Sequence, residues 1–370
     1  TTRETSGRPF HFSKYSGLLA SHVLRSIIMK VLVAPAIACI AAHPRVVSGL
    51  SETLMRNESD RDLDKASKTG SMEAFEESSQ IVSRLARLGY VTNPAPVSVQ
   101  EMRHVNTSGM VLNTLPDGHV MYSYSSRDDE IISAQLAKSH TWEEQFLNRL
   151  CKEVNDVEGT VDILDVGGNI GTYSIPLAGC LQKKGIAGKV LAIEAMPDIA
   201  HHLEASIVSN SLQDFVELYN YAVSDGSEPA ETVRMSMSAT NKGGSNVIEK
   251  NAPKHERSGG IVDVKVTTLD SILLQRSPVP RVYVMKMDIE GFEGLALKGA
   301  KHFMSATPPC VLQMEFTEGW LSKVGTPVDM VVKMLKQWGY DVPPLPKQWQ
   351  FTTVFYQKDL DRCRSRFTSK

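Results

Sequence analysis

The chain has 370 residues, of which 42% are hydrophobic and 22% are charged, and its formal net charge is −2. This length and composition allow a large hydrophobic core and one catalytic domain with extensions. A charge so close to neutral excludes a strongly basic protein, so we expect no nucleic-acid partner and only local basic patches.

The first 50 residues differ in composition from the rest of the chain. Their beginning is basic and rich in serine, and an apolar run follows over residues 31–42. That run is too short to span a bilayer but is typical of the hydrophobic part of a signal peptide, with residues 36–38 as an Ala-x-Ala cleavage site. We therefore predict a targeting or disordered segment over residues 1–50, and a location in the secretory pathway or an organelle. The alternatives are a buried or frayed helix, a cytoplasmic protein, or a natural start at Met29.

The next segment, residues 51–108, is first polar and charged and then amphipathic, which indicates a helical or linker extension. Residues 109–124 alternate in hydropathy around a Pro-Asp-Gly turn and predict a β-hairpin. An amphipathic helix is expected over residues 142–154. We place a main domain at residues 109–357 and a C-terminal tail at residues 358–370.

The stretch at residues 161–174 organises the main domain. It reads V-D-I-L-D-V-G-G-N-I-G-T-Y-S, an apolar run followed by a glycine-rich turn. The run is typical of a buried parallel strand, and the apolar spacing beyond Gly171 is that of a helix. Strand, glycine-rich turn and helix together are the first unit of a nucleotide-binding α/β sheet.

The residues of this turn indicate which nucleotide binds. A dinucleotide fingerprint that starts at Gly167 requires glycine where the chain has Asn169 and Thr172. Asp165 would repel a pyrophosphate but attract an ammonium or sulfonium group. Glu194 ends the next expected strand, where an acid is placed to bind ribose hydroxyls. These features favour S-adenosylmethionine over NAD, and the alternative is a glycine-rich turn that binds no ligand.

Acidic residues recur at the ends of the expected strands. Further strands are expected over residues 215–223, 261–267, 281–287 and 309–316, with a final hairpin at residues 340–342 and 351–356. Ligands of open α/β sheets bind outside the carboxyl ends of the strands. The acids at such ends are Asp165, Glu194, Asp288 and Glu315. We therefore expect an acidic rim that suits a cationic cofactor and supplies candidate bases.

Five motifs follow one another through the main domain. They are I-L-D-V-G-G-N-I-G-T-Y-S, A-I-E-A-M-P, A-V-S-D, T-T-L-D-S-I, and M-K-M-D-I-E-G-F-E followed by L-K-G-A. Over roughly residues 109–356 they resemble the FkbM family of S-adenosylmethionine-dependent methyltransferases. The last motif is the most specific, because Lys-x-Asp-x-Glu-Gly-x-Glu is unusual at the fourth strand of other methyltransferases. The chain departs from the family at Gly168, where the family usually has alanine.

The resemblance implies a Rossmann-like class I methyltransferase fold of the α/β class. Such a fold has a seven-stranded, mostly parallel sheet with helices on both faces, here with an N-terminal extension. The implied cofactor is S-adenosyl-L-methionine. The residues assigned to it are Asp165, Gly167, Asn169 and Gly171 for the methionine part, Glu194 for the ribose, and Ala222 and Asp225 near the adenine. The cluster assigned to the methyl acceptor comprises Lys286, Asp288, Glu290 and Glu293.

The expected reaction is methylation of an oxygen, as the resemblance implies. Methyl transfer is an in-line displacement, and most of its catalysis comes from alignment. An alcohol oxygen is a poor nucleophile until its proton begins to leave, so we expect a base, with Asp288 as first candidate and Glu315 as second. We expect Lys286 to orient a carboxylate or to bind acceptor oxygens. The alternative for this cluster is a structural network of ion pairs.

Neither metal nor disulfide chemistry is predicted. Asp288 and Glu315 could bind a divalent metal, but no ligand spacing demands one, so we predict none. The five cysteines are scattered and form no C-x-x-C pair; they are Cys39, Cys151, Cys180, Cys310 and Cys363. Their spacing indicates neither a zinc site nor a disulfide framework.

Three classes of function remain open. We favour a methyltransferase that O-methylates a hydroxyl of a sugar, glycan or small metabolite. The second class is a protein or peptide methyltransferase, in which residues 241–260 could form one wall of a peptide groove. The third is a catalytically silent, methyltransferase-like binding domain, against which the intact glycines and carboxylates argue. The sequence specifies neither the acceptor nor the oligomeric state, and it predicts no stable membrane span.

Overall fold

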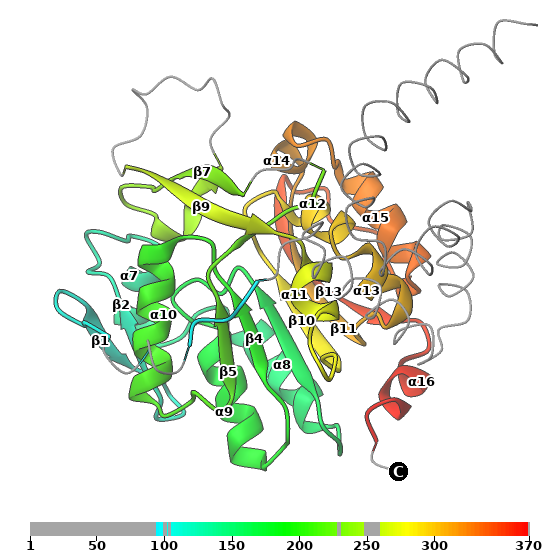
Figure 1. Cartoon of the computed structure of the whole chain (residues 1–370), viewed down its shortest axis with the longest axis horizontal. Coiled ribbons are helices and arrows are strands. Elements are labelled where there is room, and N and C mark those ends of the chain that lie inside the picture. The colour runs from blue at the N-terminus through cyan, green and yellow to red at the C-terminus, as the bar shows by residue number, and fades with distance from the viewer. Residues whose placement is uncertain (1–93, 99–101, 103–104, 228–230, 248–259, 369–370) are drawn as a thin grey trace, which may run out of the picture. The chain divides into compact units, whose positions relative to one another are not determined.

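The computed structural model describes residues 94–98, 102, 105–227, 231–247 and 260–368. The predicted targeting segment and most of the predicted helical extension lie outside these residues. The described part of the chain is built on a seven-stranded sheet with the order β12-β13-β11-β10-β3-β4-β5 (Figure 1). The strands are β3 Asp162–Val166, β4 Val190–Ile193, β5 Val216–Tyr219, β10 Val282–Met287, β11 Val311–Thr317, β12 Tyr340–Asp341 and β13 Gln350–Gln357.

Five neighbouring strands of this sheet, from β11 to β5, are parallel. β3 pairs in parallel with β4 and with β10, while β5 and β11 pair in the same sense with β4 and β10. β13 runs antiparallel to both β11 and β12. The structure therefore confirms the predicted seven-stranded, mostly parallel sheet and its final antiparallel hairpin.

Helices cover both faces of the sheet, as predicted. One face carries α8 Glu144–Asn155, α9 Ser174–Lys184, α10 Pro197–Ser209 and α16 Leu360–Ser365. The other carries α11 Leu269–Leu274, α12 Glu293–Lys298, α13 Lys301–Ala306, α14 Glu318–Lys323 and α15 Val328–Gln337. A hydrophobic core lies on each face of the sheet, the first under α8, α9, α10 and α16 and the second under α11 to α15. Successive strand residues point alternately into these cores: Ile163 belongs to the first core and Leu164 to the second. Because both faces are buried, the parallel strands are continuous apolar runs.

The expected strand at residues 215–223 is interrupted in the structure. β5 ends at Tyr219, and β6 Ala222–Val223 joins a second sheet with the order β6-β9-β7-β8. Between them, Asn220 Nδ2 donates hydrogen bonds to the carbonyl oxygens of Glu194 (2.8 Å) and Ala195 (3.0 Å). The side-chain amide thus ties the chain to the end of β4 where it leaves the main sheet. The hydropathy of the segment could not show this change of sheet.

The second sheet contributes to the cavity wall at the carboxyl ends of the main sheet, and a hairpin packs along α10. The second sheet also contains β7 Thr232–Ser236, β8 Asn246–Val247 and β9 Ile261–Thr267, with a short 3-10 helix, η2 Lys242–Gly244, between β7 and β8. The expected hairpin forms from β1 Val111–Thr114 and β2 Val120–Ser123, and α7 Ile132–Ser139 follows it. Side chains of α10 pair with the outer edge of β2: the backbone N–H of Tyr122 donates to Ser206 Oγ (2.9 Å).

Two disulfides correct the prediction that the cysteines form no framework. Cys151 of α8 is bonded to Cys180 of α9, and Cys310, just before β11, is bonded to Cys363 of α16. The paired cysteines lie 29 and 53 residues apart in sequence. Helix packing brings each pair together, so spacing along the chain could not reveal the pairing.

The domain also extends beyond its predicted end at residue 357. The predicted tail contains α16, which the Cys310–Cys363 disulfide holds against the first core. Phe367 is buried in that core and lies edge-on to the ring of Tyr283. In the described part of the chain, no helix combines the length and the apolar character that crossing a membrane requires.

The disulfides can be tested by counting free thiols. In protein prepared from an oxidising compartment and denatured without reductant, we expect the four paired cysteines not to react with iodoacetamide. After reduction all four should be alkylated, which controls for their accessibility. Peptide mass spectrometry measures both states. Full alkylation before reduction would contradict the two disulfides.

Candidate active site

A cavity of about 650 Å³ lies at the carboxyl ends of the parallel strands. The residues that line it include Val166 at the end of β3, Glu194 after β4, Asp288 after β10 and Glu315 near the end of β11. The structure therefore brings three of the four predicted rim carboxylates to one cavity. Asp165, the fourth, is not among the described residues that line the cavity.

The glycine-rich turn forms one wall of this cavity and passes very close to the end of β10. Gly167 has a φ of 86°, and a Cβ built on it would lie 1.8 Å from the carbonyl oxygen of Asp288. Only glycine permits both this backbone conformation and this approach. Asn169 follows at a φ of 48°, with its backbone N–H directed at Glu194.

Glu194 holds the glycine-rich turn in place. Its Oε2 accepts a hydrogen bond from the backbone N–H of Asn169 (2.8 Å), and its Oε1 accepts one from that of Met196 (2.9 Å). Burial raises the pKa of Glu194, and the two backbone N–H groups oppose that rise. Each carboxylate oxygen carries a second lone pair, so Glu194 can still accept hydrogen bonds from a ligand in the cavity.

Asp165 lies beneath the turn and is fully buried. Ser174 Oγ donates a hydrogen bond to its Oδ2 (2.6 Å), and Lys286 Nζ lies 3.6 Å from its Oδ1. Lys286 in turn donates to the carbonyl oxygen of Gly167 (2.7 Å). Burial alone would lower the pKa of Lys286, but the carboxylates of Asp165 and Asp288 reverse that effect and leave it raised. Lys286 thus remains cationic and joins the turn to the end of β10.

Asp288, Glu290 and Glu315 also line the cavity, and Glu293 lies close to Asp288 and Glu315. Asp288 has a side chain that is 36% exposed, and its Oδ2 lies 3.8 Å from Lys286 Nζ. Burial, reinforced by the charge of Asp288, raises the pKa of Glu290 to about 8 and that of Glu315 to about 9. Burial also raises the pKa of Glu293 to about 7, although backbone N–H groups oppose the rise. Glu293 lies behind the cavity wall, and its residue is only 1% exposed.

The two residues assigned to the adenine differ in position. Ala222 lines the cavity beside Tyr221 and Val223. Asp225 is not among the lining residues that the structure describes, and its Oδ1 accepts hydrogen bonds from the backbone N–H and the hydroxyl of Ser227. Burial acts to raise the pKa of Asp225, but these hydrogen bonds outweigh it and leave the pKa lowered. Asp225 therefore stabilises the turn after β6.

Several lining residues were not singled out from the sequence. Glu143, at the start of α8, lines the cavity and accepts a hydrogen bond from the hydroxyl of Tyr173 (2.7 Å). Trp320 and Trp349 also line the cavity, and Trp349 is 69% exposed. No motif marked these residues, because their positions depend on how distant loops pack.

The loop at residues 241–245 forms another part of the wall. Asn241, Gly243 and Ser245 line the cavity. A Cβ built on Gly243 would lie 2.6 Å from Asn169 Nδ2, so this loop passes directly against the glycine-rich turn. The proposed peptide-groove wall at residues 241–260 includes residues 248–259, which lie outside the described part of the chain.

Comparison with known proteins gives a family match over part of the chain. Residues 165–342 match the model of the methyltransferase FkbM domain. No curated protein matches the chain. Among solved structures, the precorrin-6y C5,15-methyltransferase of Geobacter metallireducens is 11% identical, with 59% of this chain and 91% of that chain covered and a TM-score of 0.31. A SAM-dependent methyltransferase of Aquifex aeolicus is 14% identical, with 58% and 98% covered and a TM-score of 0.29. The tRNA m1G37 methyltransferase of M. jannaschii is 11% identical, with 67% and 57% covered and a TM-score of 0.31. Through its family match, the chain carries a methyltransferase domain of the FkbM family over residues 165–342.

Proposed function

We propose that the protein transfers a methyl group from S-adenosylmethionine to a hydroxyl of a sugar, glycan or small metabolite. The observation that carries this proposal is the division of one cavity into two sides. The glycine-rich turn and Glu194 follow β3 and β4 and form one side, whereas Asp288 and Glu290 follow β10, Glu315 lies in β11, and these three acids form the other side. The first side suits a nucleoside, and the second suits a hydroxyl that must lose a proton.

The residues of the first side fit the proposed cofactor. Glu194 is buried at the cavity wall and keeps lone pairs that can accept hydrogen bonds from ribose hydroxyls. Tyr221, Ala222 and Val223 offer apolar surface for the adenine. Asp165 acts from beneath, because it holds Lys286 against the turn and does not reach the cavity. S-adenosylmethionine supplies the methyl group on a sulfonium, which leaves as a neutral thioether.

The second side fits an acceptor with both polar and apolar surface. Asp288 is the exposed carboxylate nearest to Lys286. We propose that Asp288 accepts the proton of the acceptor hydroxyl while the hydroxyl oxygen forms its new bond to the methyl carbon. Lys286 orients Asp288, and Glu290 and Glu315 offer further oxygens to acceptor hydroxyls. Trp349 presents a large exposed ring at the same cavity, suited to the apolar face of a sugar ring.

The substitution Glu194→Ala tests the cofactor side. We expect the affinity for S-adenosylmethionine to fall at least about tenfold, because the loss of hydrogen bonds to a charged group is worth roughly 1.5–3 kcal/mol. Titration calorimetry measures the affinity. The matched control is Glu144→Ala, which removes an exposed acid outside the cavity and should bind as the wild type does. Unchanged binding in Glu194→Ala would remove Glu194 from the cofactor site.

The acceptor class is tested by label transfer. The protein is incubated with methyl-labelled S-adenosylmethionine and with separated glycan, small-metabolite, lipid, protein and RNA fractions. Label in the glycan or small-metabolite fraction supports the proposal. Label in protein favours the peptide-methyltransferase alternative, and label in RNA overturns the expectation of no nucleic-acid partner. Cofactor binding without transfer to any fraction favours a silent binding domain.

The disulfides also bear on location. Disulfides persist in oxidising compartments and are rare in the cytosol. The Cys151–Cys180 and Cys310–Cys363 bonds therefore support a location in the secretory pathway, in agreement with the targeting segment expected over residues 1–50. The proposed acceptors, glycans among them, are available there.

A further inference from the structure

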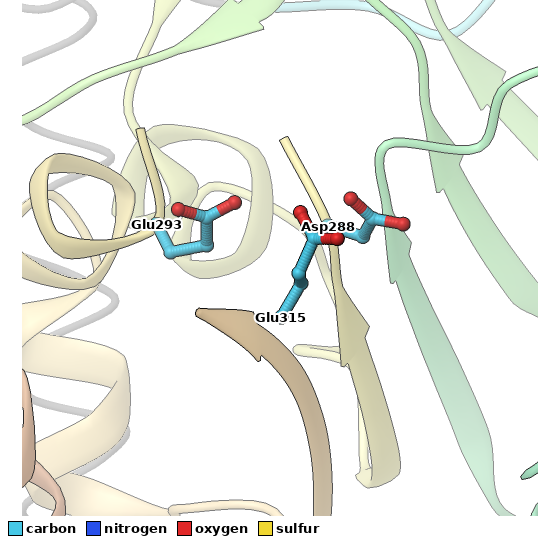
Figure 2. Close-up of side chains that lie close together, drawn as sticks. All are labelled: Asp288, Glu293 and Glu315. Carbon is cyan, nitrogen blue, oxygen red and sulfur yellow. The ribbon is translucent and has the colours of Figure 1, made fainter. Parts of the chain in front are cut away.

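Three carboxylates from different elements converge at the acceptor side of the cavity. Asp288 follows β10, Glu293 begins α12 and Glu315 lies in β11. One oxygen of each lies within 4.8 Å of one oxygen of each of the others. Figure 2 shows the Glu315 carboxylate standing between those of Glu293 and Asp288 in this view. Glu293, unlike the other two, is almost completely buried.

Two of these carboxylates each carry one anchored and one unpartnered oxygen. Glu293 Oε1 accepts hydrogen bonds from the backbone N–H groups of Ile289 (2.9 Å) and Gly291 (3.2 Å). Glu293 Oε2 is buried and accepts no hydrogen bond from the described residues. Glu315 repeats the pattern: its Oε1 accepts from Gln350 Nε2 (2.7 Å), and its Oε2 is buried without a donor in the described part of the chain. Buried polar atoms normally have partners, so two orphan oxygens in one cluster indicate a missing partner, and an ion is one kind of partner that would satisfy both.

The protein's own cation does not provide that partner. Lys286 Nζ donates to the carbonyl oxygen of Gly167 and lies within 4.0 Å of Asp165 and Asp288. Among the described residues, no lysine, arginine or histidine forms an ion pair with Glu293 or Glu315. Glu290 also lines this cavity and supplies no positive charge.

We infer that Asp288, Glu293 and Glu315 bind a divalent cation that prefers oxygen ligands, namely Mg²⁺, Mn²⁺ or Ca²⁺. Carboxylate oxygens are the preferred ligands of these ions. Oxygens on opposite sides of an ion with bonds of about 2.4 Å are about 4.8 Å apart. The observed limit of 4.8 Å between the ligand oxygens therefore meets a necessary condition for one ion to contact all three. The sequence allowed a metal at Asp288 and Glu315 but predicted none, because no ligand spacing demanded one.

The use of this cation rests on the proposed function, whereas its binding does not. A cation between the ends of β10 and β11 faces the acceptor side of the cavity, where it can bind an acceptor hydroxyl and lower the pKa of that hydroxyl. The proton then passes to an oxygen of Asp288. This is compatible with metal binding because the cation needs only one of the two Asp288 oxygens.

The experiment is a titration of the full chain with Mn²⁺, without cofactor or acceptor, followed by electron paramagnetic resonance. We expect one saturable site for which Mg²⁺ or Ca²⁺ competes. Glu293→Gln and Glu315→Gln should each weaken Mn²⁺ binding at least about tenfold, because each replaces a charged ligand by a neutral amide. The amide oxygen of Gln can still accept the anchoring hydrogen bonds. Thermal melting reports whether each variant folds, and Glu315→Gln alone suffices if Glu293→Gln does not.

The matched control is Glu290→Gln, which removes an acid from the same cavity but from outside the three-residue cluster. This control substitution should change the Mn²⁺ affinity less than about threefold. If its effect equals that of Glu315→Gln, the cation is attracted only by the overall negative charge of the cavity, and the proposed site is wrong. Absence of saturable binding up to about 1 mM Mn²⁺, the weak end of protein Ca²⁺ sites, would also overturn it. If methyl transfer is observed but Mn²⁺ does not bind, the cation site is wrong and the proposed function stands. Mn²⁺ binding in a protein that transfers no methyl group rejects the proposed function alone.

Discussion

The substitution Gly167→Ala is expected to displace the glycine-rich turn and to weaken cofactor binding strongly. A Cβ at this position would lie 1.8 Å from the carbonyl oxygen of Asp288, which is backbone and cannot rotate away. The φ of 86° adds a second penalty. Left-handed backbone costs a non-glycine residue about 1–2 kcal/mol, and overpacking costs about 1–3 kcal/mol. If both free-energy penalties must be overcome when the cofactor binds, together they lower its affinity by at least about 30-fold.

The neighbouring glycine provides the matched control. A Cβ on Gly168 would lie 3.2 Å from Leu203 Cδ2, the end of a flexible side chain, and 3.6 Å from the Cβ of Ala192. Gly168→Ala should therefore bind S-adenosylmethionine nearly as the wild type does, consistent with the alanine that the FkbM resemblance implies at this position. Calorimetry and thermal melting of the two variants measure the difference. Equal effects at both positions would show that the approach of Gly167 to Asp288 does not control the site.

The substitution Asp288→Asn should lower turnover by roughly 10²-fold or more, the scale of the loss of a general base. Asparagine keeps the shape of the side chain but cannot take the proton of the acceptor. The affinity for S-adenosylmethionine should change much less, because Glu194 and the glycine-rich turn carry that binding. Glu315→Gln should have a smaller effect on turnover than Asp288→Asn. Steady-state kinetics with the identified acceptor, together with calorimetry, measure these quantities.

Adding excess Mn²⁺ distinguishes the two roles assigned to Asp288, which are binding the cation and accepting the proton. If Asp288 mainly holds the divalent cation, saturating Mn²⁺ should restore most of the turnover of Asp288→Asn. If it takes the proton, the defect should persist at saturation, which is the result we expect. Full activity of Asp288→Asn without added metal would contradict both roles. A collapse of cofactor affinity in this variant would place Asp288 in the cofactor site instead.

The pattern along the chain was sufficient to predict the main sheet. The run at residues 161–174 specifies strand, turn and helix through local rules: apolar residues that suit a strand buried on both faces, and glycine where φ is positive. The ends of β4, β10 and β11 could be located in the same way. Because the carboxyl ends of parallel strands meet at one edge, the gathering of Glu194, Asp288 and Glu315 at one cavity followed from strand position alone.

Only the tertiary structure decided which groups these side chains contact. The register of β3 against β10 places Asp165 opposite Lys286, so Asp165 meets a buried cation beneath the turn instead of facing the cavity. Strand position could not show this, because register depends on pairing between segments more than 100 residues apart.

The same reason applies to the disulfides and to the cation cluster. The Cys310–Cys363 bond and the approach of Glu293 to Glu315 both depend on how helices pack onto the sheet. Local hydropathy specifies which face of a helix is buried. Local hydropathy does not specify which residue of another element that face will contact. These contacts determine which cysteines pair and which carboxylates lie together.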